Sequence, residues 1–155
     1  MHELIRRAGA EDADAVARLL RDFNAEYQDP APPQKEMAER IRALLAYGDT
    51  IILVAGEPPC AVSVLRFRAA LWSPKLECHL AELYVVPGRR GQGIGRALME
   101  ASIESARAEG AGTMELGTGE DDVVARALYE SLGFDNHEHG PGGVPTVSYF
   151  YEREL

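Results

Sequence analysis

One stretch of this chain restricts its fold more than any other: an apolar, strand-like segment that runs through alternate glycines into a helical pattern. Residues 83–86 favour a strand, which Pro87 and Gly88 end because proline lacks a ladder donor and glycine weakens strands. Helical spacing begins at Ile94. The first amides of such a helix have no intrahelical acceptor and lie at the positive end of its macrodipole. The order of strand, glycine turn and helix therefore predicts an anion-binding site.

The spacing of the glycines in this turn indicates which type of phosphate-binding loop it can be. Gly91, Gly93 and Gly95 lack the Cβ atoms that would keep a phosphate away from the backbone. A Walker loop is excluded because the chain contains no Gly-Lys pair. The dinucleotide fingerprint is excluded because its third glycine must stand one position after Gly95. A glycine-rich turn without any ligand is the remaining alternative.

Two segments resemble those of one enzyme family. Arg90-Gly91-Gln92-Gly93-Ile94-Gly95 resembles the acetyl-coenzyme A motif of the GCN5-related N-acetyltransferases (GNAT), Arg/Gln-x-x-Gly-x-Gly/Ala. Residues 122–134 resemble that family's Asn-x-x-Ala-x-x-Leu-Tyr-x-x-x-Gly-Phe segment, with Asp122 where asparagine is usual. An ionised Asp122 can accept a hydrogen bond but cannot donate one. The resemblance covers residues 81–134.

The fold class implied is a mixed α/β domain that spans residues 1–155 as a single unit. We expect a central, mostly antiparallel sheet of about six to seven strands, flanked by about four helices, with a βαβ unit around the glycine turn. The two strands at 50–55 and 60–68 should form an antiparallel hairpin. The other expected elements are strands at 3–7, 76–86, 113–117, 134–138 and 144–151 and helices around 16–23, 37–45, 93–109 and 122–132.

Composition excludes several classes of protein. A net charge of −9 argues against non-specific nucleic-acid binding, which needs a basic surface. No apolar run reaches the roughly 18 residues of a membrane span, and the N-terminus lacks a signal-peptide core, so we expect a cytoplasmic protein. Cys60 and Cys78 lack metal-site spacing and are expected to be reduced structural thiols. His137 and His139 fit a solvated loop better than a metal site, and no metal is expected.

The resemblance implies how acetyl-coenzyme A would be held. The backbone of residues 83–85 should pair with pantetheine as an added strand and polarise the thioester carbonyl, and the amides of residues 91–96 should hold the pyrophosphate. Asp122 departs from the family pattern, so any contact that it makes with the cofactor should be one in which it accepts a hydrogen bond. The predicted cofactor-binding residues are Leu83, Tyr84, Val85, Arg90, Gly91, Gln92, Gly93, Ile94, Gly95, Arg96 and Asp122.

Tyr129 is the predicted general acid. In the family the matching tyrosine lies near the cofactor sulfur, where the departing thiolate needs a proton. A phenol with an ordinary pKa near 10 stays protonated until then. The alternative is a tyrosine packed in the core with its hydroxyl satisfied by another group.

Glu82 is the predicted base. An acceptor amine arrives largely protonated, so a base must remove its proton directly or through water, and Glu82 is the best candidate. The alternatives for Glu82 are a solvated residue or a carboxylate that pairs with the charge of the acceptor. His79 is the second candidate base, although strand alternation places it on the opposite face from Glu82 unless a bulge intervenes. Trp72, Tyr27 and Asp29 belong to loops that border the acceptor cleft in the family, and they could hold an alkylammonium group or simply anchor those loops.

The function implied is transfer of an acetyl group from acetyl-coenzyme A to a primary amine of a small molecule or a protein, by direct attack on the thioester. The rival is a binding module, in which the fold serves as a silent coenzyme A sensor or partner subunit. The acceptor stays unidentified at this level. The oligomeric state is also open, with a homodimer among the alternatives.

Overall fold

The computed structural model of the chain describes residues 4–118, 122–134, 137–139 and 145–147, the last two ranges by their main chain only. The chain divides into two compact units, residues 1–117 and 118–155. The single domain predicted above therefore stays a prediction. Within the described residues, no helix is both long and apolar enough to cross a bilayer.

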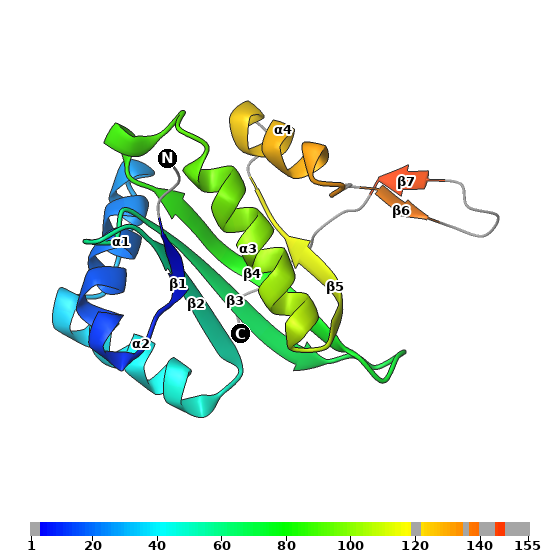
Figure 1. Cartoon of the computed structure of the whole chain (residues 1–155), viewed down its shortest axis with the longest axis horizontal. Coiled ribbons are helices and arrows are strands. Elements are labelled where there is room, and N and C mark those ends of the chain that lie inside the picture. Colours follow the sequence, from blue (N-terminus) through cyan, green and yellow to red (C-terminus); the bar gives the residue numbers. More distant parts are fainter. Residues whose placement is uncertain (1–3, 119–121, 135–136, 140–144, 148–155) are drawn as a thin grey trace. The chain divides into compact units, whose positions relative to one another are not determined.

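The first unit is a five-stranded sheet with helices on both faces, and its strands follow one another in space in the order of the chain (Figure 1). Two short 3₁₀ turns precede α1 and follow β4. The elements are β1 (Ile5–Arg7), α1 (Ala13–Glu26), α2 (Gln34–Tyr47), β2 (Thr50–Ala55), β3 (Ala61–Ala69), β4 (Leu76–Val85), α3 (Ile94–Ala108) and β5 (Ala111–Leu116).

The pairing of these strands confirms the predicted mixed sheet. Strands β1 to β4 pair antiparallel with their neighbours, and β5 alone pairs parallel, with β4. A parallel partner requires a crossover, which α3 supplies. The predicted βαβ unit around the glycine turn is thus confirmed. This sheet has five strands among the described residues, fewer than the six to seven expected.

The second unit contains α4 (Val123–Ser131) and two short strands, β6 (His137–His139) and β7 (Pro145–Val147). The two strands pair antiparallel with each other and form a separate sheet, which accounts for the lower strand number of the main sheet. The Asp122 carboxylate caps α4 by accepting from the Ala125 N–H at 3.1 Å. Gly133 follows α4 at φ +90°, the left-handed conformation in which glycine commonly ends a helix.

Successive side chains of the central strands lie on opposite faces of the sheet, and both faces are covered by helices. Val62, Val64 and Tyr84 pack into one core with the apolar face of α1 and α2. Ser63, one residue out of step, faces α3, where its hydroxyl lies 2.8 Å from that of Ser102. The sheet thus has an α1/α2 face and an α3 face, and each residue of β4 belongs to one of them.

A bulge in β4 changes which residues share a face. Val64 pairs with Glu82, but Leu65 pairs with Leu80, so Ala81 is an extra residue with no partner in β3. Because one residue is skipped, the alternation of side chains shifts by one beyond this point. His79 pairs with Arg66 and Glu82 with Val64, and these two partners lie on the same face of β3. The bulge therefore brings His79 and Glu82 onto the α1/α2 face together.

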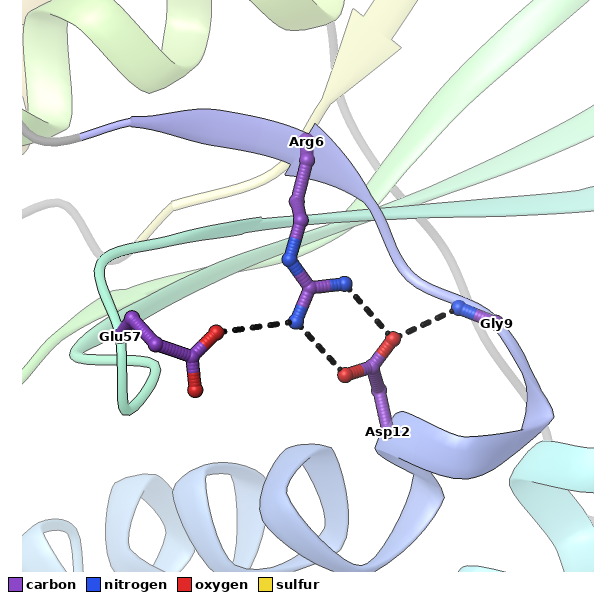
Figure 2. Close-up of polar contacts among 4 residues, drawn as sticks. All are labelled: Arg6, Gly9, Asp12 and Glu57. Carbon is purple, nitrogen blue, oxygen red and sulfur yellow. Dashed lines mark hydrogen bonds and ion pairs between the residues drawn. The ribbon is translucent and has the colours of Figure 1, made fainter.

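An ion pair joins the first strand to the start of α1 (Figure 2). The Arg6 guanidinium donates two hydrogen bonds of 2.8 Å to the two oxygens of Asp12, which also accepts from the Gly9 N–H at 2.8 Å. Glu57 lies farther from Arg6, at 3.7 Å. The hydrogen bonds from Arg6 are the main reason why the pKa of Asp12 lies below its ordinary value.

The ion pair between Arg6 and Asp12 should make the stability of the fold decrease in acid. Because the pKa of Asp12 is lower in the folded chain than in the unfolded chain, its contribution is complete above the unfolded pKa of about 4 and is lost as the pH falls through the folded pKa. We expect Asp12→Ala to lower the free energy of unfolding at pH 7 by about 1–2 kcal/mol. Urea titrations of both proteins from pH 7 downward measure the difference. A difference that grows as the pH falls would contradict this assignment.

Candidate active site

One edge of β4 is open beyond the bulge. The last residue of β4 that pairs with β5 is Leu80, which lies opposite Leu116. From Ala81 to Val85, no strand within the described residues lies on that side. Strand β3 still pairs with the other side of β4 over the same length. This stretch of β4 is therefore an edge to which an extended ligand can add as a strand.

The register shows which main-chain groups this edge offers. Val86 N–H donates to the Cys60 carbonyl at 2.9 Å, so the alternation of an antiparallel ladder directs the main chain of Glu82 and Tyr84 toward β3 as well. The N–H and C=O groups of Leu83 and Val85 then point away from β3, along the open edge. Of the three predicted residues 83–85, Leu83 offers both of its main-chain groups and Val85 its N–H, because the Val85 carbonyl accepts from Arg90, whereas Tyr84 uses its main chain within the sheet.

The glycine turn follows directly from this edge. Gly91 and Gly93 have φ angles of +77° and +82°, the left-handed region that suits glycine, and a Cβ at either position would stand in open space. Helix α3 begins at Ile94 with Gly93 as its N-cap. No described residue accepts a hydrogen bond from the main-chain N–H groups of residues 91–95. These amides and the start of α3 form a cradle suited to a phosphate.

Arg90, the first residue of the motif, points its side chain away from this cradle. Its Nε donates to the Val85 carbonyl at 2.9 Å, and its Nη2 donates to Glu26 Oε1 at 2.7 Å. The guanidinium carbon lies 5.6 Å from the centre of the Tyr84 ring. The guanidinium is thus engaged by the strand and by α1. Glu26 is a residue that sequence reasoning missed, since nothing in the sequence signals that the end of α1 meets residue 90.

Glu82 lies half-buried on the α1/α2 face at the start of the open edge. No hydrogen bond or ion pair of its carboxylate is found among the described residues. Burial raises the pKa of Glu82 above its ordinary value because the charged form loses solvation. A carboxylate with a raised pKa is a better proton acceptor than an ordinary glutamate, as a catalytic base requires.

His79 shares the face of Glu82 but lies beside β5, and its buried Nδ1 has no hydrogen-bond partner among the described residues. Its Nδ1 lies 3.6 Å from Glu115 Oε1, and Glu115 also accepts a hydrogen bond of 3.0 Å from Arg68. In the register of β4, His79 precedes the bulge, while Glu82 follows it beside the open edge. Glu82 is the candidate base closer in sequence to the groups that would pair with a thioester-bearing ligand.

Tyr129 and Asp122 belong to the second unit. Tyr129 is only 9% exposed, and its ring meets that of Phe134 edge to face at a centroid distance of 6.1 Å. Its carbonyl accepts from the Phe134 N–H at 3.0 Å, which fixes the end of α4. The Asp122 carboxylate caps α4, and this role requires it only to accept a hydrogen bond. The general-acid role of Tyr129 and the cofactor contact of Asp122 both stay predictions.

The predicted aromatic pair at the acceptor cleft does not form. Tyr27 packs on Phe23, which stacks on Tyr84 near the carboxyl end of β4. Trp72 is 93% exposed in the loop that joins β3 to Leu76, at the opposite end of the same strand. Leu76 and Tyr84 lie eight positions apart along β4, which separates these ends by about 26 Å. That hypothesis is therefore wrong, because the β3–β4 hairpin carries Trp72 away from α1.

Among the residues whose side chains are described, no group of three His, Cys, Asp or Glu residues is arranged to hold a metal ion. The side chains of His137 and His139 lie outside the described part. Cys60 and Cys78 are both buried and unpaired. Burial raises the pKa of Cys78 to about 11, so its thiol stays protonated and is a poor nucleophile at neutral pH.

Comparison with known proteins adds independent information. The family model described as "Acetyltransferase (GNAT) family" matches residues 14–134. A solved structure from Arthrobacter sp. FB24, assigned as an acetyltransferase, superposes with a TM-score of 0.88 at 44% identity and covers 99% of this chain and 96% of that one. The IAA acetyltransferase of Azospirillum brasilense is 39% identical over 92% of each chain. The bovine (Bos taurus) thialysine N-epsilon-acetyltransferase is 31% identical over 84% of this chain and 82% of its own.

Proposed function

The chain belongs to the acetyltransferase (GNAT) family and is an N-acetyltransferase, and we propose that it transfers an acetyl group from acetyl-coenzyme A to a primary amine by direct attack on the thioester. The observation that carries this proposal is the open edge of β4 next to a cradle of amides that have no acceptor among the described residues. Pantetheine is an extended chain with amide groups, which suits the edge, and pyrophosphate suits the cradle. Both parts lie in the first unit.

The acceptor amine would lose its proton on the side of Glu82. In the proposed reaction the amine nitrogen bonds to the acetyl carbon, the carbon–sulfur bond breaks, and the amine proton passes to the Glu82 carboxylate directly or through water. The thiolate that leaves takes a proton, which we assign to the Tyr129 hydroxyl. The outward main chain of Leu83 or Val85 would polarise the thioester carbonyl. Glu82 then releases its proton to solvent and Tyr129 regains one, so that a protonated amine and acetyl-coenzyme A yield an N-acetyl amine, free coenzyme A and one proton.

A route in which the acetyl group is first transferred to a side chain of the enzyme has less support than direct attack of the amine. It requires a nucleophilic side chain, and the two cysteines are the natural candidates. Cys78 is fully buried with a raised pKa, and Cys60 is buried as well. No observation favours the silent coenzyme A sensor. The bovine relative is named for an ε-amine of thialysine, which agrees with a primary amine as the class of acceptor here.

Binding of acetyl-coenzyme A tests the donor part of this proposal. A ligand that binds only the folded chain must stabilise it, by about 2.7 kcal/mol at 100 times its Kd. We expect acetyl-coenzyme A to raise the melting temperature by several degrees, and free coenzyme A to do the same because both carry the arm and the pyrophosphate. Adenosine, which lacks both, is the control. An unchanged melting temperature at millimolar acetyl-coenzyme A would remove the basis of the proposal.

Substitution of Glu82 tests the base. Because burial raises its pKa, its carboxylate forms only as the pH rises above the ordinary glutamate range, and kcat/KM for the amine should rise with it. We expect Glu82→Gln to lower kcat about 100-fold, near the lower limit for general-base catalysis, and to abolish that acidic limb. Glu77→Gln, on the same strand before the bulge, is the control. A variant that keeps the acidic limb of the wild type would exclude Glu82 as the base.

A further inference from the structure

The proposed donor site has two parts that one side chain joins. The open edge of β4 would bind pantetheine, and the amides of residues 91–95 would bind pyrophosphate. Arg90 lies at the start of the turn, and its Nε bonds to the carbonyl of Val85, the last residue of the strand, at 2.9 Å. This contact ties the start of the turn to the end of the strand, beside the main-chain bonds from Arg89 N–H to the Val86 carbonyl and from Arg90 N–H to the Pro87 carbonyl.

Glu26, at the end of α1, holds Arg90 in this position. Its Oε1 accepts from Arg90 Nη2 at 2.7 Å and from the Tyr84 hydroxyl at 3.2 Å. The Arg90 and Glu26 side chains are 48% and 31% exposed, so part of this contact is shielded from water. Tyr84 is buried and stacks on Phe23 at a centroid distance of 5.1 Å, which anchors the cluster in the core.

A guanidinium is suited to this bridging role. It presents several N–H donors in a fixed planar fork, so Nε and Nη2 can bind two acceptors at once. Without Glu26, the long Arg90 side chain gains rotamers, and its bond to the Val85 carbonyl must be formed at a greater cost in side-chain entropy. Charge-assisted hydrogen bonds of this kind are stronger than neutral ones.

We infer that Glu26 is a positioning residue for the acetyl donor, which through Arg90 fixes the spacing between the strand edge and the amide cradle. The inference rests on the proposed function. A ligand that occupies both parts gains from their fixed spacing, because binding of one end places the other at a high effective concentration. A ligand that occupies one part gains nothing from it. Loss of Glu26 should therefore weaken the whole donor selectively.

The experiment compares whole and partial ligands on the full chain. We expect Glu26→Ala to raise the Kd of coenzyme A and the KM of acetyl-coenzyme A about tenfold, as for the loss of one charge-assisted hydrogen bond, with kcat at saturation unchanged. The Kd values of S-acetylpantetheine and of inorganic pyrophosphate, each tested alone, should stay within about twofold. Glu26→Gln, which keeps an acceptor oxygen, should fall between wild type and Glu26→Ala.

A matched control is available on α2. Glu36 and Arg40 form an exposed ion pair with the same 2.7 Å contact, remote in sequence from β4 and the turn. Glu36→Ala should leave both Kd and KM unchanged. Adding Glu26→Ala to Arg90→Ala should change the Kd of coenzyme A little further, because in this inference Glu26 acts on the donor through Arg90.

The outcomes separate this inference from the proposed function. If the wild type does not bind coenzyme A, both are overturned. If the wild type binds it and Glu26→Ala binds it equally well, the positioning role is overturned and the proposed function stands. The same holds if pyrophosphate and S-acetylpantetheine lose as much affinity as coenzyme A, since that pattern indicates general damage to the fold. Melting curves of each variant, taken without ligand, show whether it is folded.

Discussion

Replacement of Tyr129 by phenylalanine is expected to lower turnover by roughly 10²- to 10⁴-fold, which is about 3–5 kcal/mol of barrier. The physical reason is that the substitution removes only the hydroxyl, which we assign as the proton donor to the departing thiolate. The ring keeps its edge-to-face contact with Phe134, so folding should be preserved. Turnover, Kd for acetyl-coenzyme A and melting temperature should be measured on one preparation.

The competing interpretation of Tyr129 makes a different prediction. If the hydroxyl only satisfies a structural hydrogen bond, its removal should cost about 1 kcal/mol of stability and leave most of the turnover. Tyr47→Phe is the matched control, because Tyr47 is 81% exposed at the end of α2. Wild-type turnover in Tyr129→Phe on a competent amine would rule out Tyr129 as the essential acid.

Gly93→Val is expected to weaken binding of acetyl-coenzyme A by at least about 100-fold. A β-branched residue at φ +82° is strained by roughly 1–3 kcal/mol. Its side chain would also project into the space from which a phosphate approaches the amides, since no described residue comes within 4 Å of a Cβ at this position. A calorimetric Kd, together with the melting temperature, separates lost affinity from lost stability.

Gly48 supplies the control for backbone strain. It ends α2 at φ +98°, and a Cβ there would also meet nothing within 4 Å. Gly48→Val should therefore be destabilised to a similar extent but bind the donor normally. Equal affinity of a folded Gly93→Val and the wild type would mean that residues 91–95 form only a turn.

Local sequence signals were enough to predict the turn and the elements around it. Pro87, the alternate glycines and the helical spacing from Ile94 act over a few residues, so strand β4, the glycine turn and helix α3 follow from the sequence. The hairpin of β2 and β3 followed for the same reason, from a short turn between two apolar runs.

Features that depend on register could not be predicted in this way. The extra residue Ala81 carries no signal in the sequence, yet it places His79 and Glu82 on one face. The length of the β3–β4 hairpin separates Trp72 from Tyr27. The contact of Glu26 with Arg90 joins residues far apart in the chain and depends on how α1 packs across β4. Each of these arises from tertiary packing rather than local preference.

The most direct test of the central claim is a product assay with the purified chain. The protein is mixed with acetyl-coenzyme A and a panel of primary amines, and both free thiol and N-acetylated amine are quantified over time. We predict that at least one amine yields the two products in equal amounts. Within each variant, Glu82→Gln or Tyr129→Phe, the formation of thiol and of acetylated amine should slow by the same factor. Thiol release without an acetylated amine, at a rate independent of the amine added, would contradict the account.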